Sequence, residues 1–541
     1  MSREILGLPR NRRFILALSV AGLQSLSAVA LLAASAWLIS RAAEQPPVLY
    51  LMVGVVAVRA FALGRATFRY AERLLSHDGA FRQLGQIRVR LFEALVPFAP
   101  AGMGNQNRAD AASRLVADVD ELQNLPLRVA VPFVQVGVVS VGAVVGLSFI
   151  SPLAATAMAN GLVLALLTTT IMSYRFARAA DLALAPQKAQ LAANIIGGFE
   201  RFELLQAYGW WQPAMAEMAG HEAAVIRSSK RSTLTAGVSQ ALISLLLTLS
   251  TLATGFVALL EFDAHPAVLL AVITLLPLAV FDVVSASQGA TSAFSRYQAS
   301  AKRVREQLER ELPAQLAIAS GTQRLESIES LELQDVAITY PGAQSAAVSA
   351  INLKLSLGET VLLRGPNGSG KSSIASLLVR FINPTEGRYL INSRNAEEFD
   401  ADSIRARIGL IEQSPSIFSA SVRANLLLAA PNASDDELVA VLKRVGLQSM
   451  LQERAGLDTE LGDLGKLVSG GQAQRIALAR ALLADFDVLI FDEPSSNLDA
   501  ENAQLLVADL LSIAKQSRRR AVLLISHDSR IDVVADRTIS L

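Results

Sequence analysis

The chain contains stretches of uncharged, mostly apolar residues that are too long to be buried inside a soluble domain. Residues 14–40 carry no charge over 27 positions, and residues 129–174 carry none over 46. A helix crosses the hydrocarbon core of a bilayer in about 20 residues, so the first stretch is long enough for one span and the second for two. A signal-peptide core is only about 7–15 residues long, so the first stretch is predicted to stay as an anchor.

Three further apolar runs complete a set of six predicted spans. One follows Pro47, one covers residues 232–260, and one begins at Pro266. Only 18% of all residues are charged, against about 25% in soluble proteins, and the excess of apolar residues lies before residue 300. The first part of the chain, residues 1–311, is therefore predicted to be an α-helical transmembrane domain with six spans.

Positive charges lie on one side of these predicted spans. Arginines and lysines precede the first span and occupy the two long loops after the second and fourth spans, whereas the other connections carry only Arg41. Cytoplasmic loops carry an excess of Lys and Arg, so both termini and both long loops are predicted to be cytoplasmic. The loops have apolar residues at helical spacing, as in residues 114–122, and are predicted to be helices that extend the spans. Two separate cytoplasmic subdomains are the alternative.

Three charged residues interrupt the apolar runs. Arg59 and Arg65 lie in the second run and Asp282 lies in the sixth. Such groups cost a few kcal/mol in a membrane unless they pair or face a polar cavity, so they are predicted to line a path for an anionic substrate. For Arg65 the alternative is a side chain that reaches the interface along its apolar stem.

The pattern changes after a linker that ends near Gly321. Strand-like alternation in residues 331–340 stops at Pro341 and Gly342, and alternating strands and helices continue to the C-terminus. This order of elements predicts an α/β domain over residues 325–541.

A phosphate loop lies at residues 365–372, which read Gly-Pro-Asn-Gly-Ser-Gly-Lys-Ser and match G-x-x-x-x-G-K-S. It follows a predicted strand and opens a predicted helix, where backbone N–H groups converge on phosphates. Lys371 is predicted to reach the outer phosphates of ATP, and Ser372 to coordinate Mg²⁺. The predicted contacts of this loop with the nucleotide are Gly365, Asn367, Gly368, Ser369, Gly370, Lys371, Ser372 and Ser373.

Two carboxylates end the apolar strand at residues 488–493. Asp492 is predicted to contact Mg²⁺, and Glu493 to act as the general base for the attacking water. A helix-capping role is the alternative for an Asp-Glu-Pro sequence taken alone. The phosphate loop upstream favours the catalytic interpretation.

These motifs resemble the nucleotide-binding domain of ABC transporters over residues 325–541. The resemblance also includes Ser-Gly-Gly-Gln at residues 469–472, Ser-Asn-Leu-Asp at residues 496–499, and a histidine after a strand. Val468, Asn497 and Asp463 depart from the usual pattern, but none of them removes a catalytic group.

The resemblance implies roles for residues that spacing alone does not assign. Gln413 resembles the glutamine that senses Mg²⁺-ATP, Tyr340 the aromatic that stacks on adenine, and His527 the histidine that contacts the γ-phosphate. The signature residues complete the ATP site of a partner subunit; they are Ser469, Gly470, Gly471 and Gln472.

In the membrane half, residues 34–43, 69–78 and 114–122 resemble the CydC family, one half of a heterodimeric ABC exporter of the bacterial inner membrane. This resemblance implies a CydD-like partner, ATP and Mg²⁺ as cofactors, and a role in cytochrome bd assembly. It also implies export of a small thiol, either cysteine or glutathione, or the handling of heme.

His77 is the candidate for a heme b ligand, because the family is reported to carry this group and His77 lies in the most recognisable segment. Imidazole is a common axial ligand of heme iron, and Arg69 and Arg73 could pair with the propionates. A histidine that caps the helix or forms a hydrogen bond where it leaves the bilayer is the alternative.

Two other functions remain open at this point: half of a lipid or drug ABC exporter, and a heme-sensing regulatory membrane ATPase. Glu493 and His527 favour a pump, since a scaffold has no need of a general base. The net charge of +1 gives no signal for nucleic-acid binding, and the absence of cysteine excludes disulfides and thiolate-held metals.

Overall fold

The computed structural model describes residues 6–9, 11–102, 114–172, 178–262, 266–286, 289–316, 321–494, 500–515, 520–527 and 535–541. The chain divides into two compact units. The helical unit comprises Met1–Ala94 and Asn107–Arg310, and the α/β unit comprises Leu95–Gln106 and Glu311–Leu541.

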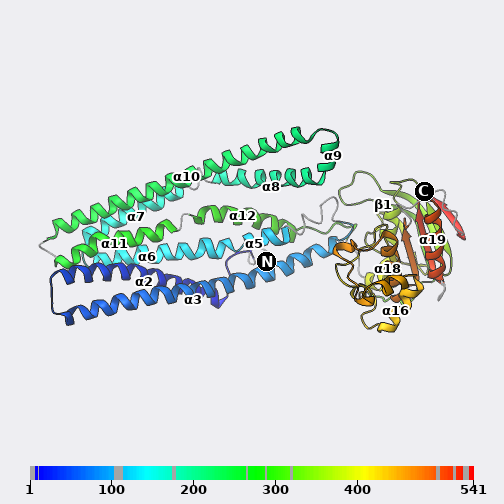
Figure 1. Ribbon diagram of the computed structural model, residues 1–541, viewed down its shortest axis with the longest axis horizontal. Helices are drawn as coiled ribbons and strands as arrows, with labels where there is room; N and C mark the ends of the chain where they lie inside the picture. The colour runs from blue at the N-terminus through cyan, green and yellow to red at the C-terminus, as the bar shows by residue number, and fades with distance from the viewer. Residues whose placement is uncertain are drawn as a thin grey trace. The chain divides into compact units, whose positions relative to one another are not determined.

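Apolar helices that run side by side build the helical unit (Figure 1). They are α2 (Arg12–Ala43), α3 (Val48–Leu95), α6 (Val131–Ser148), α7 (Pro152–Met172), α10 (Trp211–Leu260) and α11 (Ala267–Ala286). In the described residues, five helices are long and apolar enough to cross a membrane, and α7 contributes a shorter apolar stretch, Pro152–Thr168. The six-span, all-helical prediction agrees with this set.

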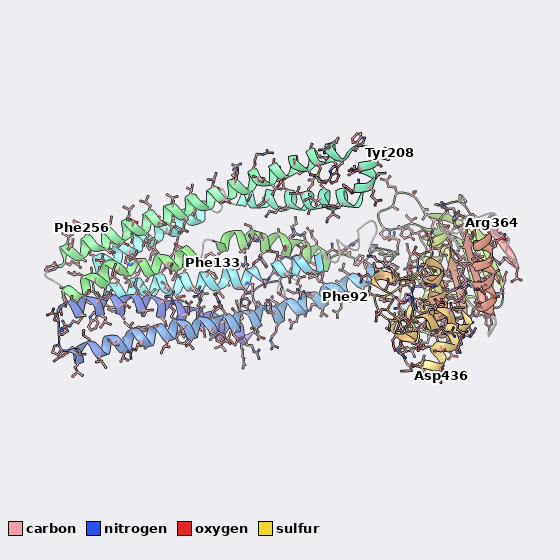
Figure 2. The ribbon with its side chains drawn as sticks, viewed as in Figure 1. Phe92, Phe133, Tyr208, Phe256, Arg364 and Asp436 are labelled. Carbon is pink, nitrogen blue, oxygen red and sulfur yellow. The ribbon has the colours of Figure 1, made fainter. Side chains whose placement is uncertain are left out.

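Apolar side chains of many sizes, from alanine to phenylalanine, fill the centre of this bundle. Met158, Ile273 and Phe281 are fully buried there, each on a different turn of α7 or α11. Large side chains are also exposed, among them Phe133 and Phe256, which are labelled in Figure 2. An apolar exterior of this kind suits a surface that lipid or another subunit covers.

The long loops are also helical, as the spacing of their apolar residues predicted. In the second loop, α8 (Arg178–Glu200) and α9 (Phe202–Ala207) lead back into α10. In the first, α5 (Val119–Glu121) lies between two π-helical stretches, η2 (Arg114–Asp118) and η3 (Leu125–Ala130). The amphipathic helix α12 (Gly289–Leu308) packs against α5 and both π-helical stretches.

Two sheets form the α/β unit. The antiparallel sheet has the order β2 (Val348–Ser356), β1 (Ser330–Ile338), β4 (Glu386–Ile391), β5 (Arg394–Asn395). The parallel sheet has the order β6 (Ile408–Ile411), β7 (Val488–Asp492), β8 (Ala521–Ser526), β3 (Thr360–Arg364), β9 (Arg537–Ser540). Strands β7 and β8 are buried along their whole length, as expected for central parallel strands covered on both faces.

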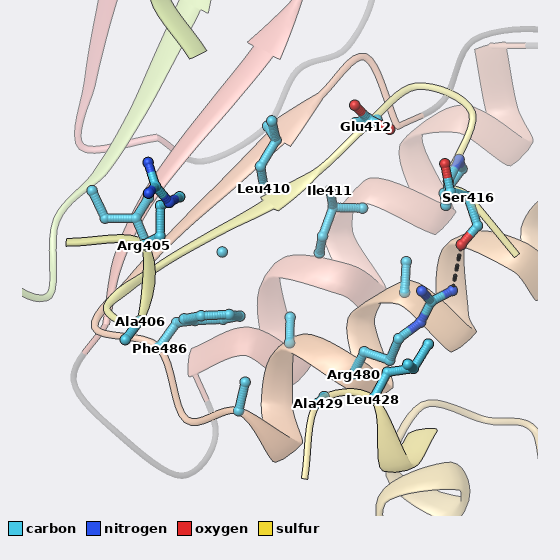
Figure 3. Close-up of a pocket in the computed structure, with 16 residues that line it drawn as sticks. Arg405, Ala406, Leu410, Ile411, Glu412, Ser416, Leu428, Ala429, Arg480 and Phe486 are labelled. Atoms are coloured by element: carbon cyan, nitrogen blue, oxygen red, sulfur yellow. Dashed lines mark hydrogen bonds between the residues drawn. The ribbon is translucent and has the colours of Figure 1, made fainter. Parts of the chain in front are cut away.

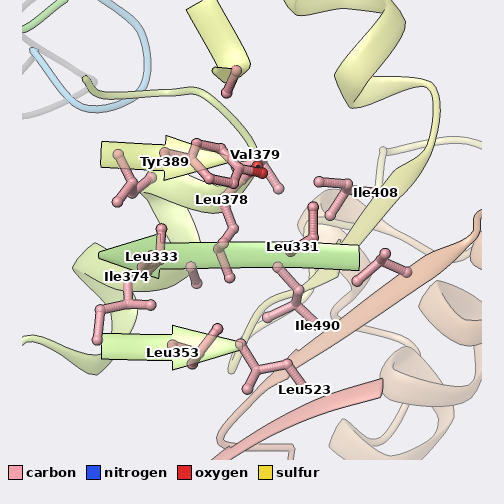
Figure 4. Packing of buried hydrophobic residues seen from close by; sticks show 14 of the residues in the cluster. Leu331, Leu333, Leu353, Ile374, Leu378, Val379, Tyr389, Ile408, Ile490 and Leu523 are labelled. Carbon is pink, nitrogen blue, oxygen red and sulfur yellow. The ribbon is translucent and has the colours of Figure 1, made fainter. Parts of the chain in front are cut away.

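The core between the sheets sets the position of the phosphate loop. Leu331, Leu353, Ile374, Ile490 and Leu523 pack together there (Figure 4), and Ile374 belongs to α13 (Lys371–Leu378), the helix after the loop. A second core lies under the remaining helices. These helices are α15 (Val422–Leu427), α16 (Asp435–Arg444), α17 (Gln448–Glu453), α18 (Gly470–Leu483) and α19 (Ala500–Lys515), whereas α14 (Ala401–Arg405) packs on the first core through Ile404.

Candidate nucleotide site

The loop between β3 and α13 requires glycine at its last position. Gly370 has φ +87°, in the left-handed region that glycine alone adopts easily. A Cβ atom at Gly370 would lie 2.1 Å from Cγ2 of Val348 and 2.4 Å from the carbonyl oxygen of Ala347. The loop can therefore pass under β2 and start a helix at Lys371 only because Gly370 has no side chain.

Lys371 lies folded back into its own loop. Its side chain is buried, and its Nζ donates hydrogen bonds to the carbonyl oxygens of Gly365 and Pro366, both at 2.9 Å. The same Nζ lies 3.5 Å from Oε1 of Glu493. A buried ammonium at a helix N-terminus provides charge and donors where a phosphate group would bind.

Asp492, the last residue of β7, offers an oxygen for a metal ion. Burial raises the pKa of its carboxyl group, and a hydrogen bond with Ser372 opposes that rise. Its Oδ1 atom is buried without a hydrogen-bond partner. Mg²⁺ is usually held by one or two carboxylates together with substrate phosphates, so an unpaired carboxylate oxygen beside the Ser372 hydroxyl fits such an ion.

Glu493 lies between two cationic or titratable groups. Its Oε1 atom is 3.1 Å from Nδ1 of His527 and 3.5 Å from Nζ of Lys371. Its φ of +48° is uncommon for a residue with a side chain, and its backbone N–H donates to the carbonyl oxygen of Ile525 at 3.0 Å. Backbone strain of this kind clusters at functional sites. The carboxylate is therefore held at the end of β7 and β8, facing the phosphate loop.

A cavity of about 430 Å³ brings the separate motifs together. It is lined by Ala347, Asn367, Gly368, Gly370, Lys371, Ser372, Ser373, Gln413 and Glu493. Tyr340 packs against the core at the end of β1 and does not line this cavity. Gly365 and Ser369 belong to the same loop but do not line the cavity. His527 and Asp492 do not line it either, but each contacts a residue that does: His527 contacts Glu493, and Asp492 forms a hydrogen bond with Ser372.

The signature residues form the start of α18 and do not line the cavity. Ser469 is the N-cap: its hydroxyl accepts a hydrogen bond from the backbone of Gln472 at 3.2 Å, and the Gln472 side chain accepts one from the backbone of Ser469 at 3.0 Å. Ser469 and Gly470 are exposed, and Gly471 is partly exposed. The motif at residues 496–499 lies outside the described residues.

Gln474 is a residue that the sequence analysis did not identify. Its side chain is buried on α18, and its Nε2 donates to the backbone carbonyl oxygens of Glu412 at 3.2 Å and Gln413 at 3.0 Å. It therefore ties the helix that carries the signature motif to the segment that brings Gln413 to the cavity. In the sequence, only its position as a second glutamine two residues after Gln472 could have indicated this contact.

A larger cavity of about 580 Å³ lies between β6 and α18 (Figure 3). Arg480 crosses one end and donates a hydrogen bond to the carbonyl oxygen of Ser416 at 2.8 Å. None of the residues lining this cavity belongs to the phosphate loop, and neither Asp492 nor Glu493 does. The smaller cavity, with its convergent donors and carboxylates, is therefore the candidate nucleotide site.

His77 lies in the helical unit, on α3. It is exposed, and its ring makes an edge contact with Phe81 at 5.5 Å between ring centroids. Arg73, one turn away on the same helix, is also exposed. Within the described ranges, no group of three or more His, Cys, Asp or Glu residues is placed to hold a metal ion.

Comparison with known proteins places the whole chain. The ABC transporter family profile matches residues 348–496. The glutathione/L-cysteine transport system ATP-binding/permease protein CydC of Escherichia coli K12 is 31% identical over 97% of this chain and 92% of its own length. The protein of the same name from Haemophilus influenzae is 29% identical over 87% of this chain and 82% of its own length.

Two other similarities are narrower. The ATP-dependent lipid A-core flippase of Escherichia coli K12 is 39% identical but over only 36% of this chain and 34% of its own length. A bacterial Atm1-family ABC exporter with ATP bound has the same fold, with a TM-score of 0.80 over 98% of this chain and 93% of that chain at 18% identity. The ABC exporter fold predicted from the sequence is confirmed.

The apolar helices and the ATP-binding unit together make this chain a multi-pass membrane protein and one half of an exporter that couples ATP hydrolysis to transport. The similarity to CydC covers nearly the whole chain, whereas the similarity to the lipid flippase covers little more than a third of it. The longer match therefore indicates which family of ABC transporters the chain belongs to. The chain belongs to the CydC family of ABC-transporter ATP-binding/permease proteins.

Proposed function

We propose that this chain pairs with a CydD-like half and exports a small thiol, cysteine or glutathione, or handles heme, across the bacterial inner membrane in support of cytochrome bd assembly. In this proposal residues 1–311 form the membrane domain and residues 325–541 the nucleotide-binding domain. One observation carries it: Glu493, Lys371 and His527 converge at a phosphate loop in a chain that also carries the apolar helices. The names of the full-length relatives supply the substrate class.

In the proposed hydrolysis step, Glu493 accepts a proton from the water that attacks the γ-phosphate. His527 holds the Glu493 carboxylate from one side, at 3.1 Å, and contacts the γ-phosphate once ATP is bound. Lys371 leaves the carbonyl oxygens of Gly365 and Pro366 for the outer phosphates. Asp492, Ser372 and Gln413 would hold Mg²⁺, Tyr340 would stack on adenine, and backbone N–H groups of the loop would bind the phosphates.

A partner half completes the ATP site in this proposal. The exposed N-terminus of α18, with Gly470 and Gly471 lacking side chains, suits the approach of a phosphate held by another cassette. The helical unit supports the same idea, because only 6% of the most apolar window of α3 is buried, against 44% for α11. A single chain purified without its partner is expected to hydrolyse little ATP.

The orientation we propose follows from the arginines and lysines of the termini and long loops. Excess positive charge marks the cytoplasmic side of a membrane protein, so both termini and the nucleotide-binding domain are placed in the cytoplasm. Lipid covers the outward apolar surface of the helices, and the proposed partners do not include nucleic acid.

We further propose that His77 is an axial ligand of heme b. Its exposed imidazole would supply a nitrogen to the iron, and Arg69 and Arg73, both exposed on α3, would pair with the propionates. Heme held there would supply a redox-active or transported iron porphyrin. The residues of this chain bind and orient it.

Transport into inverted vesicles tests the proposed substrate. Vesicles that contain this chain and its partner are given ATP and, in separate assays, reduced glutathione, cysteine, heme, or a fluorescent phospholipid. We expect ATP-dependent uptake of a thiol or of heme, and none with Glu493→Gln in a complex whose second ATP site is disabled. Uptake of the phospholipid alone would favour a lipid exporter. ATP hydrolysis controlled by heme without uptake of any compound would favour a regulatory ATPase.

A further inference from the structure

Three acidic residues in the first long loop each contact an arginine on a different turn or helix. Asp118 pairs with Arg303 of α12, Asp120 pairs with Arg88 of α3, and Glu121 lies 3.5 Å from Arg296 of α12. The stretch that carries them, residues 114–122, resembles the family sequence but has no role in the ATP site. Its contacts join three separate parts of the helical unit.

Asp118 makes the strongest of these contacts, and it is the buried one. Nε of Arg303 donates to Oδ1 at 3.1 Å and to Oδ2 at 2.9 Å, and Nη2 donates to Oδ1 at 2.5 Å. The hydroxyl of Ser300 adds a hydrogen bond to Oδ1 at 3.2 Å. The Asp118 side chain is 12% exposed, whereas both partners of the Arg88–Asp120 and Arg296–Glu121 pairs are more than 40% exposed. Fork-like arginine contacts to a buried carboxylate fix geometry as well as adding energy.

The backbone around Asp118 departs from regular α-helix. Asp118 ends the π-helical stretch η2, and a second π-helical stretch, η3, begins four residues after Glu121. Such stretches are rare and frequently occur at functional sites. Side-chain contacts to neighbouring helices hold this irregular segment in place, and the Asp118–Arg303 contact is the most enclosed of them.

The Asp118–Arg303 pair also links two segments of the chain that each lead from one unit to the other. One segment is α12, which is followed by the linker at residues 311–316. The other is residues 95–102, which follow α3 and precede the segment with Asp118. Within the α/β unit these two segments meet: Phe98 and Leu316 are both 3% exposed in the same core. A Cβ atom at Gly102 would lie 2.1 Å from Cδ1 of Leu316.

The segment that follows α3 and the segment that follows α12 are thus held together by two contacts, one inside each unit. In the α/β unit the contact is apolar, between Phe98, Gly102 and Leu316. In the helical unit it is the Asp118–Arg303 pair, in which the carboxylate is buried and the arginine is half exposed. If either contact is lost, α12 and the first long loop can move separately, and a rearrangement of the ATP site would reach only part of the helical unit.

We propose that Asp118 and Arg303 are positioning residues that make α12 and the first long loop respond to ATP as one element. The pair touches neither nucleotide nor the phosphate loop, so its role is in transmission and not in hydrolysis. The inference depends on ATP-driven transport and not on the identity of the transported molecule.

The test uses the complete complex and needs no transported substrate. Because the chain has no cysteine, spin labels can be placed at Val89→Cys on α3 and Ile226→Cys on α10, two exposed sites in the helical unit, with a cysteine-free partner. Double electron–electron resonance then measures the label distance with and without ATP and vanadate. The main variant is Asp118→Asn with Arg303→Met, which removes both charges, so that no unpaired carboxylate is left buried at position 118.

We expect the double variant to bind ATP and to keep its basal ATPase, while the population that shifts on vanadate trapping falls by about fivefold or more, the lower end of ordinary coupling between sites. The charge exchange Asp118→Arg with Arg303→Asp should restore part of the shift. Lys302→Met is the matched control, since Lys302 forms an exposed pair with Glu306 on the same helix at 3.8 Å. A full shift in the double variant, or loss of ATP binding together with the shift, would overturn the proposal.

Discussion

The two units differ in how far this chain alone covers their apolar surfaces. In the α/β unit, strands β7 and β8 are buried from end to end by the chain's own helices and sheets. In the helical unit, α11 is 44% buried over its most apolar window and α3 only 6%. The central strands of the α/β unit are therefore covered by this chain itself, whereas its own signature residues do not line the cavity at the phosphate loop. In the helical unit the most apolar window of α3 is left almost uncovered, although the same helix buries residues such as Ala80 and Leu91 further along.

The nature of the missing cover follows from the charges on α3. Lipid can cover apolar side chains such as Leu49, but Arg59 and Arg65 are also exposed, and an arginine facing hydrocarbon costs a few kcal/mol. A polar cavity satisfies the arginines, and a protein partner can satisfy both kinds of residue. We therefore expect substitutions in the α/β unit to change the stability or the ATP hydrolysis of this chain. Substitutions on α3 should instead change its contacts with a partner, lipid or transported molecule.

The largest expected effect is that of Glu493→Gln on hydrolysis. A general base usually contributes a factor of about 10²–10⁴ in rate, and the amide keeps the shape of the side chain while it cannot accept the proton. With the second ATP site of the complex disabled, steady-state ATPase should fall by that factor while fluorescent ATP analogues still bind. Lys371→Ala is the contrasting variant, since it should lose nucleotide binding itself. Undiminished turnover in Glu493→Gln would show that the base lies elsewhere.

The next effect is on stability, and it contrasts one leucine in each unit. Leu523 is fully buried in β8 and Leu49 is 80% exposed at the start of α3. Leu523→Ala should lower the free energy of unfolding of the α/β unit by about 2–5 kcal/mol, the usual cost of such a cavity. Leu49→Ala should leave that value within about 0.5 kcal/mol. Pulse proteolysis of the detergent-solubilised chain in urea measures both. If Leu523→Ala and Leu49→Ala lowered the free energy of unfolding equally, the proposed difference between the two units would be wrong.

The same contrast explains what could be predicted from the sequence. The phosphate loop, Asp492 and Glu493 were identified because parallel strands end at one edge of the sheet, so residues distant in sequence meet there. Six apolar helices were identified because a span has a fixed length. The position of Gln474, and the pairing of Asp118 with Arg303 across 185 residues, depend on how helices pack around one another. No local pattern in the sequence encodes that packing.

A third prediction concerns the exposed side of α3, where His77 lies. If His77 binds heme, the purified complex should show a Soret band, and His77→Ala should weaken heme binding by at least about tenfold, which is what a lost second-shell partner of a metal ligand already costs. Titration with heme measures the affinity, and retained ATP binding shows that the variant is folded. Phe81→Leu is the control, since it removes the ring contact and keeps the imidazole. An unchanged Soret band in His77→Ala would leave that histidine structural.

The smallest expected effect is that of Arg59→Ala. This variant tests what covers the membrane part of α3. Arg59 is exposed in this chain and lies in an apolar run, so the covering surface must present water, an anion or a carboxylate. If Arg59 faces the transport path, its loss should reduce stimulation of ATPase by reduced glutathione or heme by about fivefold, the lower end of typical coupling between sites, with assembly unchanged. If it faces the partner's protein surface, the yield of the complex should fall and the surviving complex should respond normally. Arg65→Ala is the comparison, because an arginine that reaches the interface along its own stem should have neither effect. Normal yield and normal stimulation in Arg59→Ala would mean that lipid headgroups or water satisfy it, and that exposed charge on α3 does not mark the path.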